Sequence, residues 1–156
     1  MRLSESHVLP VPPDQAWAAL NDVGLLHQAL PGCETLLEIA PDEFVAEMAV
    51  AFGGAISRFT VYVRRHDIEA PRRCTLHFET RTAGVNGSGS AALRLAPEGL
   101  EATALQAAIE VGVGGVLGVL AAPLIELTAQ EMARQFFGAL GRLAGSRLAR
   151  ARASAA

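Results

Sequence analysis

Hydrophobic and polar residues alternate with a period of two through the middle of the chain, from Cys33 onward and most clearly from Phe44 to Val111, which predicts β-strands. The clearest alternation runs from Arg73 to Thr82, where Arg, Thr, His and Glu separate the apolar residues. Short turn sequences divide the region into five consecutive strands, and Val85-Asn86-Gly87 is typical of a tight hairpin because Asn-Gly accepts positive φ. A change of phase near Arg65 predicts a β-bulge. The pattern favours an antiparallel meander that is apolar on one face.

The segments on either side of the meander follow different patterns. A short strand, Leu3 to Leu9, precedes Pro12-Pro13, which fits a first helical turn because proline lacks the N–H that would be unpaired there. Helical spacing then continues through two short helices until Pro31-Gly32 ends the second. After the last strand, Leu117 to about Leu148 carries a broad apolar stripe, with Pro123 near its start, and predicts a long helix.

The architecture follows from the need to cover the apolar face of the sheet. Of the predicted elements, the C-terminal helix is long and apolar enough to form that second layer. We therefore predict an α+β fold in which a curved antiparallel sheet wraps around the long C-terminal helix, with two short helices after the first strand. Residues 1–148 are expected to form a single domain, and residues 149–156 a frayed tail.

Composition excludes several classes of function. The chain is 51% hydrophobic and 19% charged, and its formal net charge of −3 gives no general attraction to nucleic acid. Met1 to His7 lacks the apolar core of a signal peptide, and the uncharged stretch from Val111 to Ile125 is shorter than the ~20 residues that span a bilayer. Without a secretion signal, Cys33 and Cys74 are expected to be reduced. These features predict a cytoplasmic protein.

The sequence offers little for catalysis or cofactor binding. The four histidines are scattered, and His66 and His77 fall on the polar phases of their strands. His27 and Cys33 are close in sequence, but two candidate ligands do not make a metal site. The glycine run from Gly112 to Gly118 lacks the spacing of a dinucleotide-binding loop. We therefore expect no catalytic residues, no metal and no cofactor.

The apolar phases of the strands and the start of the long helix supply candidates for a ligand-binding space between sheet and helix. Small residues on the same phases, such as Ala46, Gly89 and Ala107, leave volume unfilled, although an ordinary packed core is the alternative for any single residue. The expected lining residues are Phe44, Met48, Phe52, Phe59, Val61, Leu76, Phe78, Leu93, Leu105, Leu120 and Leu124.

Several segments together resemble one protein family. They are Val11-Pro12-Pro13 with Ala16-Trp17, Leu20-Asn21-Asp22, Leu30-Pro31-Gly32-Cys33-Glu34, Thr103, Val113-Gly114-Gly115 and Gln135-Phe136-Phe137. The order of elements resembles the helix-grip fold of the START-like (SRPBCC) superfamily, and these residues resemble its carbon monoxide dehydrogenase G-subunit family. The resemblance implies a non-catalytic accessory protein of a molybdenum hydroxylase, one that binds an apolar molecule such as a quinone or lipid and recruits the enzyme to the inner face of the cytoplasmic membrane.

Two alternatives stay open. A polyketide cyclase/aromatase-like enzyme of the same superfamily would need acid or histidine side chains facing the helix, so His77 and Glu79 would have to point inward. A ligand-free protein-interaction domain would instead expose an apolar patch. The four arginines between Arg142 and Arg152 are either a helix end that complements the helix dipole or a salt-sensitive contact with an anionic membrane.

Overall fold

Ten elements make up the described part of the chain, residues 1–82 and 84–155, in this computed structural model. The strands are β1 (Arg2–Leu9), β2 (Cys33–Ala40), β3 (Glu43–Phe52), β4 (Ala55–Glu69), β5 (Arg73–Thr82), β6 (Val85–Pro97) and β7 (Thr103–Gly114). The helices are α1 (Pro13–Leu20), α2 (Val23–Ala29) and α3 (Val116–Ala155). All strands pair antiparallel in one sheet, in the order β1-β7-β6-β5-β4-β3-β2.

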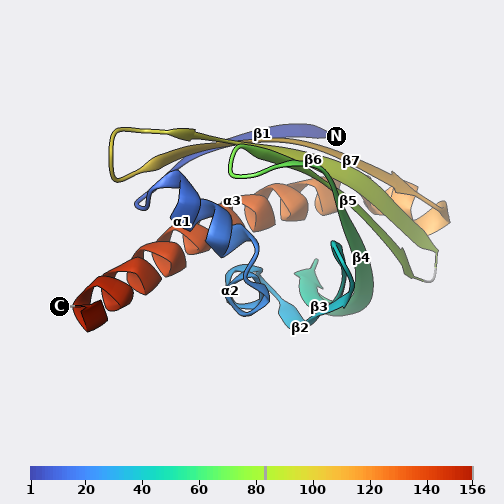
Figure 1. The fold of residues 1–156 in the computed structure, drawn as a ribbon. Helices are drawn as coiled ribbons and strands as arrows, with labels where there is room; N and C mark the ends of the chain where they lie inside the picture. Colours follow the sequence, from blue (N-terminus) through green and yellow to red (C-terminus); the bar gives the residue numbers. More distant parts are fainter. Residues whose placement is uncertain (83, 156) are drawn as a thin grey trace.

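The sheet curves around α3 (Figure 1). Strands β1, β7, β6 and β5 extend above the helix, while β4, β3 and β2 turn down beside it, and α1 and α2 lie on the same side as α3. This arrangement confirms the predicted α+β fold with two short helices after the first strand. We call the face toward α3 the inner face and the opposite one the outer face.

The inner face is closed at one end of the sheet. There, α1, α2 and the C-terminal half of α3 cover the end of β1 and the start of β7, and the side chains of Leu9, Leu105 and Leu140 are completely buried. The hydroxyl of Thr103, also fully buried, donates a hydrogen bond of 2.8 Å to the carbonyl oxygen of Val11. A buried polar group with a partner avoids the cost of lost hydration, so this bond ties the β1–α1 connection to β7. We refer to this region as the closed end.

The opposite end of the sheet holds the β3–β4 and β5–β6 hairpin tips, and we call it the open end. The first half of α3 lies here: Leu117 packs against Gly84 and Leu124 against Gly53, so the helix contacts both tips. Its apolar side chains are nevertheless exposed, Leu120 at 77%. By length and composition α3 could cross a membrane, and its most apolar stretch is only 6% buried. The apolar stretch up to Ile125, too short by itself to span a bilayer, thus continues into a longer apolar helix.

The structure differs from the sequence-based expectations in local features. Cys33–Ala40 is a sixth strand of the meander; the period of two begins at Cys33 as predicted, but the five predicted strands did not include this one, because an edge strand with register shifts does not alternate regularly in burial. The β5–β6 turn precedes Val85, so Asn86-Gly87 lies inside β6, and Gly84 supplies the positive φ of 75°. By contrast, the bulge predicted near Arg65 is confirmed, because the register of β4 shifts between His66 and Glu69. Helix α3 continues beyond Leu148 to Ala155, and the last residue of the expected tail, 156, lies outside the described residues.

Candidate ligand-binding space between the sheet and α3

The strand residues expected to line a ligand-binding space all lie on the inner face, as pairing across the sheet shows. Register partners include Phe44 with Val63, Met48 with Phe59, and Val61 with Thr80. On the other half of the sheet, Leu76 pairs with Ala91, Phe78 with Gly89, Leu93 with Ala107 and Leu95 with Leu105. Since directly paired residues point to the same face, the alternation in the sequence placed these side chains correctly.

Four of these residues belong to the packed core. Leu105 has no exposed surface, and Leu93 and Met48 are each 3% exposed. Phe44 is 6% exposed, and the guanidinium of Arg65 lies 4.9 Å from the centre of its ring. Side chains this deeply packed offer no surface to a ligand without rearrangement. For these four positions the structure therefore supports the packed-core interpretation.

Five others are only partly buried. Phe52, Phe59 and Val61 form one group with Met132 of α3, and the two phenyl rings have centroids 6.4 Å apart. Leu76 and Phe78 pack against the margin of the closed-end core. Together they give the inner face a partly exposed apolar and aromatic surface. Such a surface under a helix is the usual character of a small-molecule site.

The two α3 residues do not lie where the sequence placed them. Leu120 is 77% exposed on the side of the helix opposite Gly118, and Leu124 is 41% exposed beside the β3–β4 tip. The buried Gly118 contacts Val113 and therefore marks the side of α3 that faces the sheet. Helical spacing of four and seven from Gly118 brings Ala122 and Ile125 to that side. The apolar stripe in the sequence did not reveal which part of it the sheet covers.

A side opening lies next to the cluster against which Phe52, Phe59 and Val61 pack. It has a volume of about 440 Å³ and lies between the Pro31-Gly32 loop, β3 and α3, with Met132 in its wall. Gly32 holds the loop close to β3: it has a φ of 75°, its carbonyl accepts a 2.8 Å hydrogen bond from the Ala49 N–H, and a Cβ there would lie 2.5 Å from the Ala49 carbonyl oxygen. Only glycine fits this close approach. Because Met132 packs against the same buried cluster as Phe52 and Phe59, the opening borders the inner apolar surface.

The rim of the opening is polar. Glu131 hydrogen-bonds to Arg134 and Gln135, and these bonds lower the pKa of Glu131 to about 2. The rim of the opening therefore carries the ionised carboxylate of Glu131, paired with Arg134 and exposed to solvent.

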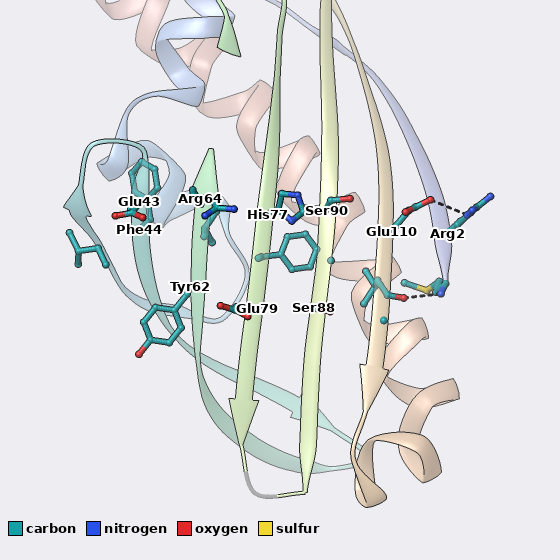
Figure 2. Close-up of a pocket in the computed structure, with 17 residues that line it drawn as sticks. Arg2, Glu43, Phe44, Tyr62, Arg64, His77, Glu79, Ser88, Ser90 and Glu110 are labelled. Atoms are coloured by element: carbon teal, nitrogen blue, oxygen red, sulfur yellow. Dashed lines mark hydrogen bonds and ion pairs between the residues drawn. The ribbon is translucent and has the colours of Figure 1, made fainter. Parts of the chain in front are cut away.

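A larger hollow of about 780 Å³ is lined mainly by polar side chains of the outer face (Figure 2). Tyr62 pairs with Glu79, and Arg64 with His77, across β4 and β5, and Ser90 follows on β6. His77 and Glu79 thus point away from α3, as their polar phase predicted. The inward-facing acid and histidine that a cyclase-like site would need are not these two residues.

Sequence reasoning missed two polar residues on the inner face. Glu5 pairs with Ala107 and His7 with Leu105, both of which are buried, so their side chains face α3. His7 Nε2 lies 3.2 Å from Glu5 Oε2. The regular alternation of Leu3 to Leu9 contained the signal, but either phase could have been the inner one. Among the described residues, no group of three or more His, Cys, Asp or Glu side chains could hold a metal ion.

Comparison with solved structures defines the class of protein. The chain superimposes on a conserved protein from Geobacillus kaustophilus with a TM-score of 0.85 and 18% identity, covering 94% of this chain and 96% of that one. The Zhui aromatase/cyclase from Streptomyces sp. R1128 matches with a TM-score of 0.67 and 19% identity over 95% of each chain. TTHA0849 from Thermus thermophilus gives 0.68 and 17%, over 94% and 99%. These matches establish a START-like, helix-grip fold.

Within this class the family is also defined. The model of the CoxG family, the G-subunit of carbon monoxide dehydrogenase, matches residues 6–144, and the chain belongs to that family. No curated protein matches it in sequence.

Proposed function

We propose that this protein is a non-catalytic accessory protein of a molybdenum hydroxylase of the carbon monoxide dehydrogenase type. It binds an apolar ligand such as a quinone or lipid between the sheet and α3. The observation that carries the proposal is the partly exposed apolar surface of Phe52, Phe59 and Val61 beneath the helix, with the side opening next to it. Family membership supports the accessory role.

Adjacent residues on opposite faces of β4 provide the test. Val61 faces α3 and Tyr62 faces the outer hollow, so tryptophan at each position fills a different space. With 2-methyl-1,4-naphthoquinone as the probe in isothermal titration, Val61→Trp is expected to weaken binding at least about tenfold, which corresponds to about 1.4 kcal/mol. The matched variant Tyr62→Trp should bind as the wild type does. The absence of wild-type binding, or the opposite response of the two variants, would refute the proposal.

The enzyme alternative has one observation in its favour, the inward-facing Glu5 and His7. The aromatase/cyclase among the structural neighbours makes this the natural second candidate. Turnover of a linear polyketide mimic by the wild type, lost in His7→Phe, would support the enzyme over the carrier.

Recruitment of the partner enzyme to the inner face of the cytoplasmic membrane is part of the proposal. Of the four C-terminal arginines, Arg147 and Arg152 form ion pairs with Asp22 and Glu101, both at 2.8 Å. Their charge is therefore partly compensated within the chain. The exposed apolar start of α3, with Leu120 at its centre, offers a stronger contact with lipid.

Cosedimentation with vesicles distinguishes the two surfaces. If the start of α3 makes the contact, Leu120→Glu abolishes binding to phosphatidylglycerol vesicles while Arg150→Gln leaves it nearly unchanged. If the arginines dominate, binding instead falls with Arg150→Gln and with added salt.

A further inference from the structure

A histidine and a carboxylate face α3 on the edge strand β1. Glu5 and His7 alternate with the exposed Ser4 and Ser6, and their side chains are only 17% and 21% exposed. On one side they are flanked by the buried Leu9 and on the other by the partly buried Leu3. The pair is therefore a polar site in otherwise apolar surroundings.

The neighbours of His7 fix its orientation. Its Nε2 faces Glu5 Oε2 at 3.2 Å, and because a carboxylate can only accept, that nitrogen carries the hydrogen and donates it. The imidazole also packs on the buried ring of Phe137, with centroids 5.3 Å apart. On α3, the pKa of Arg134 is raised chiefly by its hydrogen bond to Glu131 and further by the negative charge of Glu5.

The second ring nitrogen of His7 has no hydrogen-bond partner among the described residues. Within the described residues, the buried side-chain polar atoms without a partner are Arg65 Nε and His66 Nε2. His7 Nδ1 is not among them and forms no hydrogen bond in the described chain, so it is not completely buried and its hydrogen-bonding capacity is unused there. In the neutral imidazole, a hydrogen on Nε2 leaves Nδ1 as an acceptor.

We propose that His7, oriented by Glu5, is the polar anchor of the ligand-binding space and accepts a hydrogen bond from a hydroxyl group on an otherwise apolar ligand. The inference rests on the proposed function, because the ligand's apolar body would occupy the space under α3. From His7, that body extends past Leu3 and its register partner Ile109, both partly buried, toward the open end. The ligand class is therefore a phenol or hydroxylated aromatic rather than a pure hydrocarbon.

Two probes that differ by one hydroxyl group test the anchor: naphthalene and 2-naphthol, titrated separately and followed by their own fluorescence. The wild type is expected to bind 2-naphthol about fivefold more tightly than naphthalene, the gain from one net hydrogen bond of about 1 kcal/mol. His7→Phe keeps the ring that packs on Phe137 but removes the acceptor, so the two affinities should become equal. His77→Phe, on the outer face, is the matched control and should keep the preference.

The conservative variant separates anchoring from folding. His7→Asn keeps a hydrogen-bonding group near the position of Nδ1 and should restore part of the preference for 2-naphthol. Circular dichroism checks that each variant is folded. The role of His7 as anchor is refuted if folded His7→Phe keeps the wild-type preference for 2-naphthol, or if the wild type binds naphthalene without any such preference. In both cases the proposed apolar ligand-binding space is unaffected. If the wild type binds neither probe, both the anchor and the proposed function fail.

Discussion

The contrast between the two halves of α3 predicts that one substitution has very different effects at two positions of the same helix. Leu140 has no exposed surface and packs at the closed end, whereas Leu120 is 77% exposed. Leu140→Ala removes three carbon atoms from the core, which costs about 2.4 kcal/mol at about 0.8 kcal/mol per methylene. A residual cavity on the order of 50 Å³ adds about 1 kcal/mol at about 24 cal/mol per Å³. The expected loss in the free energy of unfolding is therefore about 3.5 kcal/mol.

The same arithmetic at Leu120 gives a small effect. Only about a quarter of its side chain is buried, so Leu120→Ala should lower the free energy of unfolding by at most about 0.6 kcal/mol. Urea unfolding followed by circular dichroism at 222 nm measures the free energy of unfolding of both variants. An unchanged m-value shows that the surface exposed on unfolding is the same as in the wild type. If Leu120→Ala lowered the free energy of unfolding as much as Leu140→Ala does, the start of α3 would have to be covered in solution. That result would contradict the exposure of α3 at the open end.

Four further substitutions test three other contacts. Asp22→Ala removes the N-cap of α2 together with an ion pair and should lower the free energy of unfolding by about 1–2 kcal/mol. Arg147→Gln removes only the ion pair and should lower it by at most about 1 kcal/mol. Equal losses in the two variants would argue against a stabilising role of the cap. The lowered pKa of Glu131, about 2 beside Arg134, means that the carboxylate's contribution is fully present above its ordinary pKa and disappears as pH falls through about 2. Glu131→Gln should therefore flatten the stability curve between about pH 4.5 and 2; an NMR titration of the wild-type carboxyl with a midpoint above about 4 would contradict this. Gly89→Ala would place a Cβ 2.3 Å from a backbone oxygen of β7. Thermal unfolding should therefore show a loss of stability of about 1–3 kcal/mol. An unchanged stability would show that β6 and β7 can move apart at this point without cost.

Most of the sheet could be predicted because its alternation is local information. The alternation of neighbouring residues predicts that Phe78 faces inward and His77 outward, and the structure confirms both orientations. Strand β2 was not predicted as a separate strand, because Leu37 and Ile39 are more than half exposed on an edge strand, where no opposing layer enforces alternation. The turn between β5 and β6 was predicted at the wrong residues because both Gly84 and Gly87 can adopt the positive φ that a tight turn needs. The pairing of β5 with β6 places Gly87 inside the strand and leaves Gly84 in the turn.

The candidate site required non-local information at three points. Leu120 belongs to an apolar stripe, but only the path of α3 over the sheet determines which side is covered. Leu105 lies on the correct face yet too deep in the core to contact a ligand. The inward phase of Glu5 and His7 depends on their pairing with β7, about a hundred positions later in the chain.

That long-range pairing also affects the order in which the protein can fold. Strands β2 to β7 join sequential neighbours through short connections, so they can form one after another. β1 instead needs a partner as distant as Leu105 for His7, and closing so long a loop has a larger entropic cost before any contact offsets it. During synthesis, the apolar Leu9 and Val11 therefore stay exposed until β7 has left the ribosome. β1 is therefore expected to join the sheet after β2 to β7 have paired.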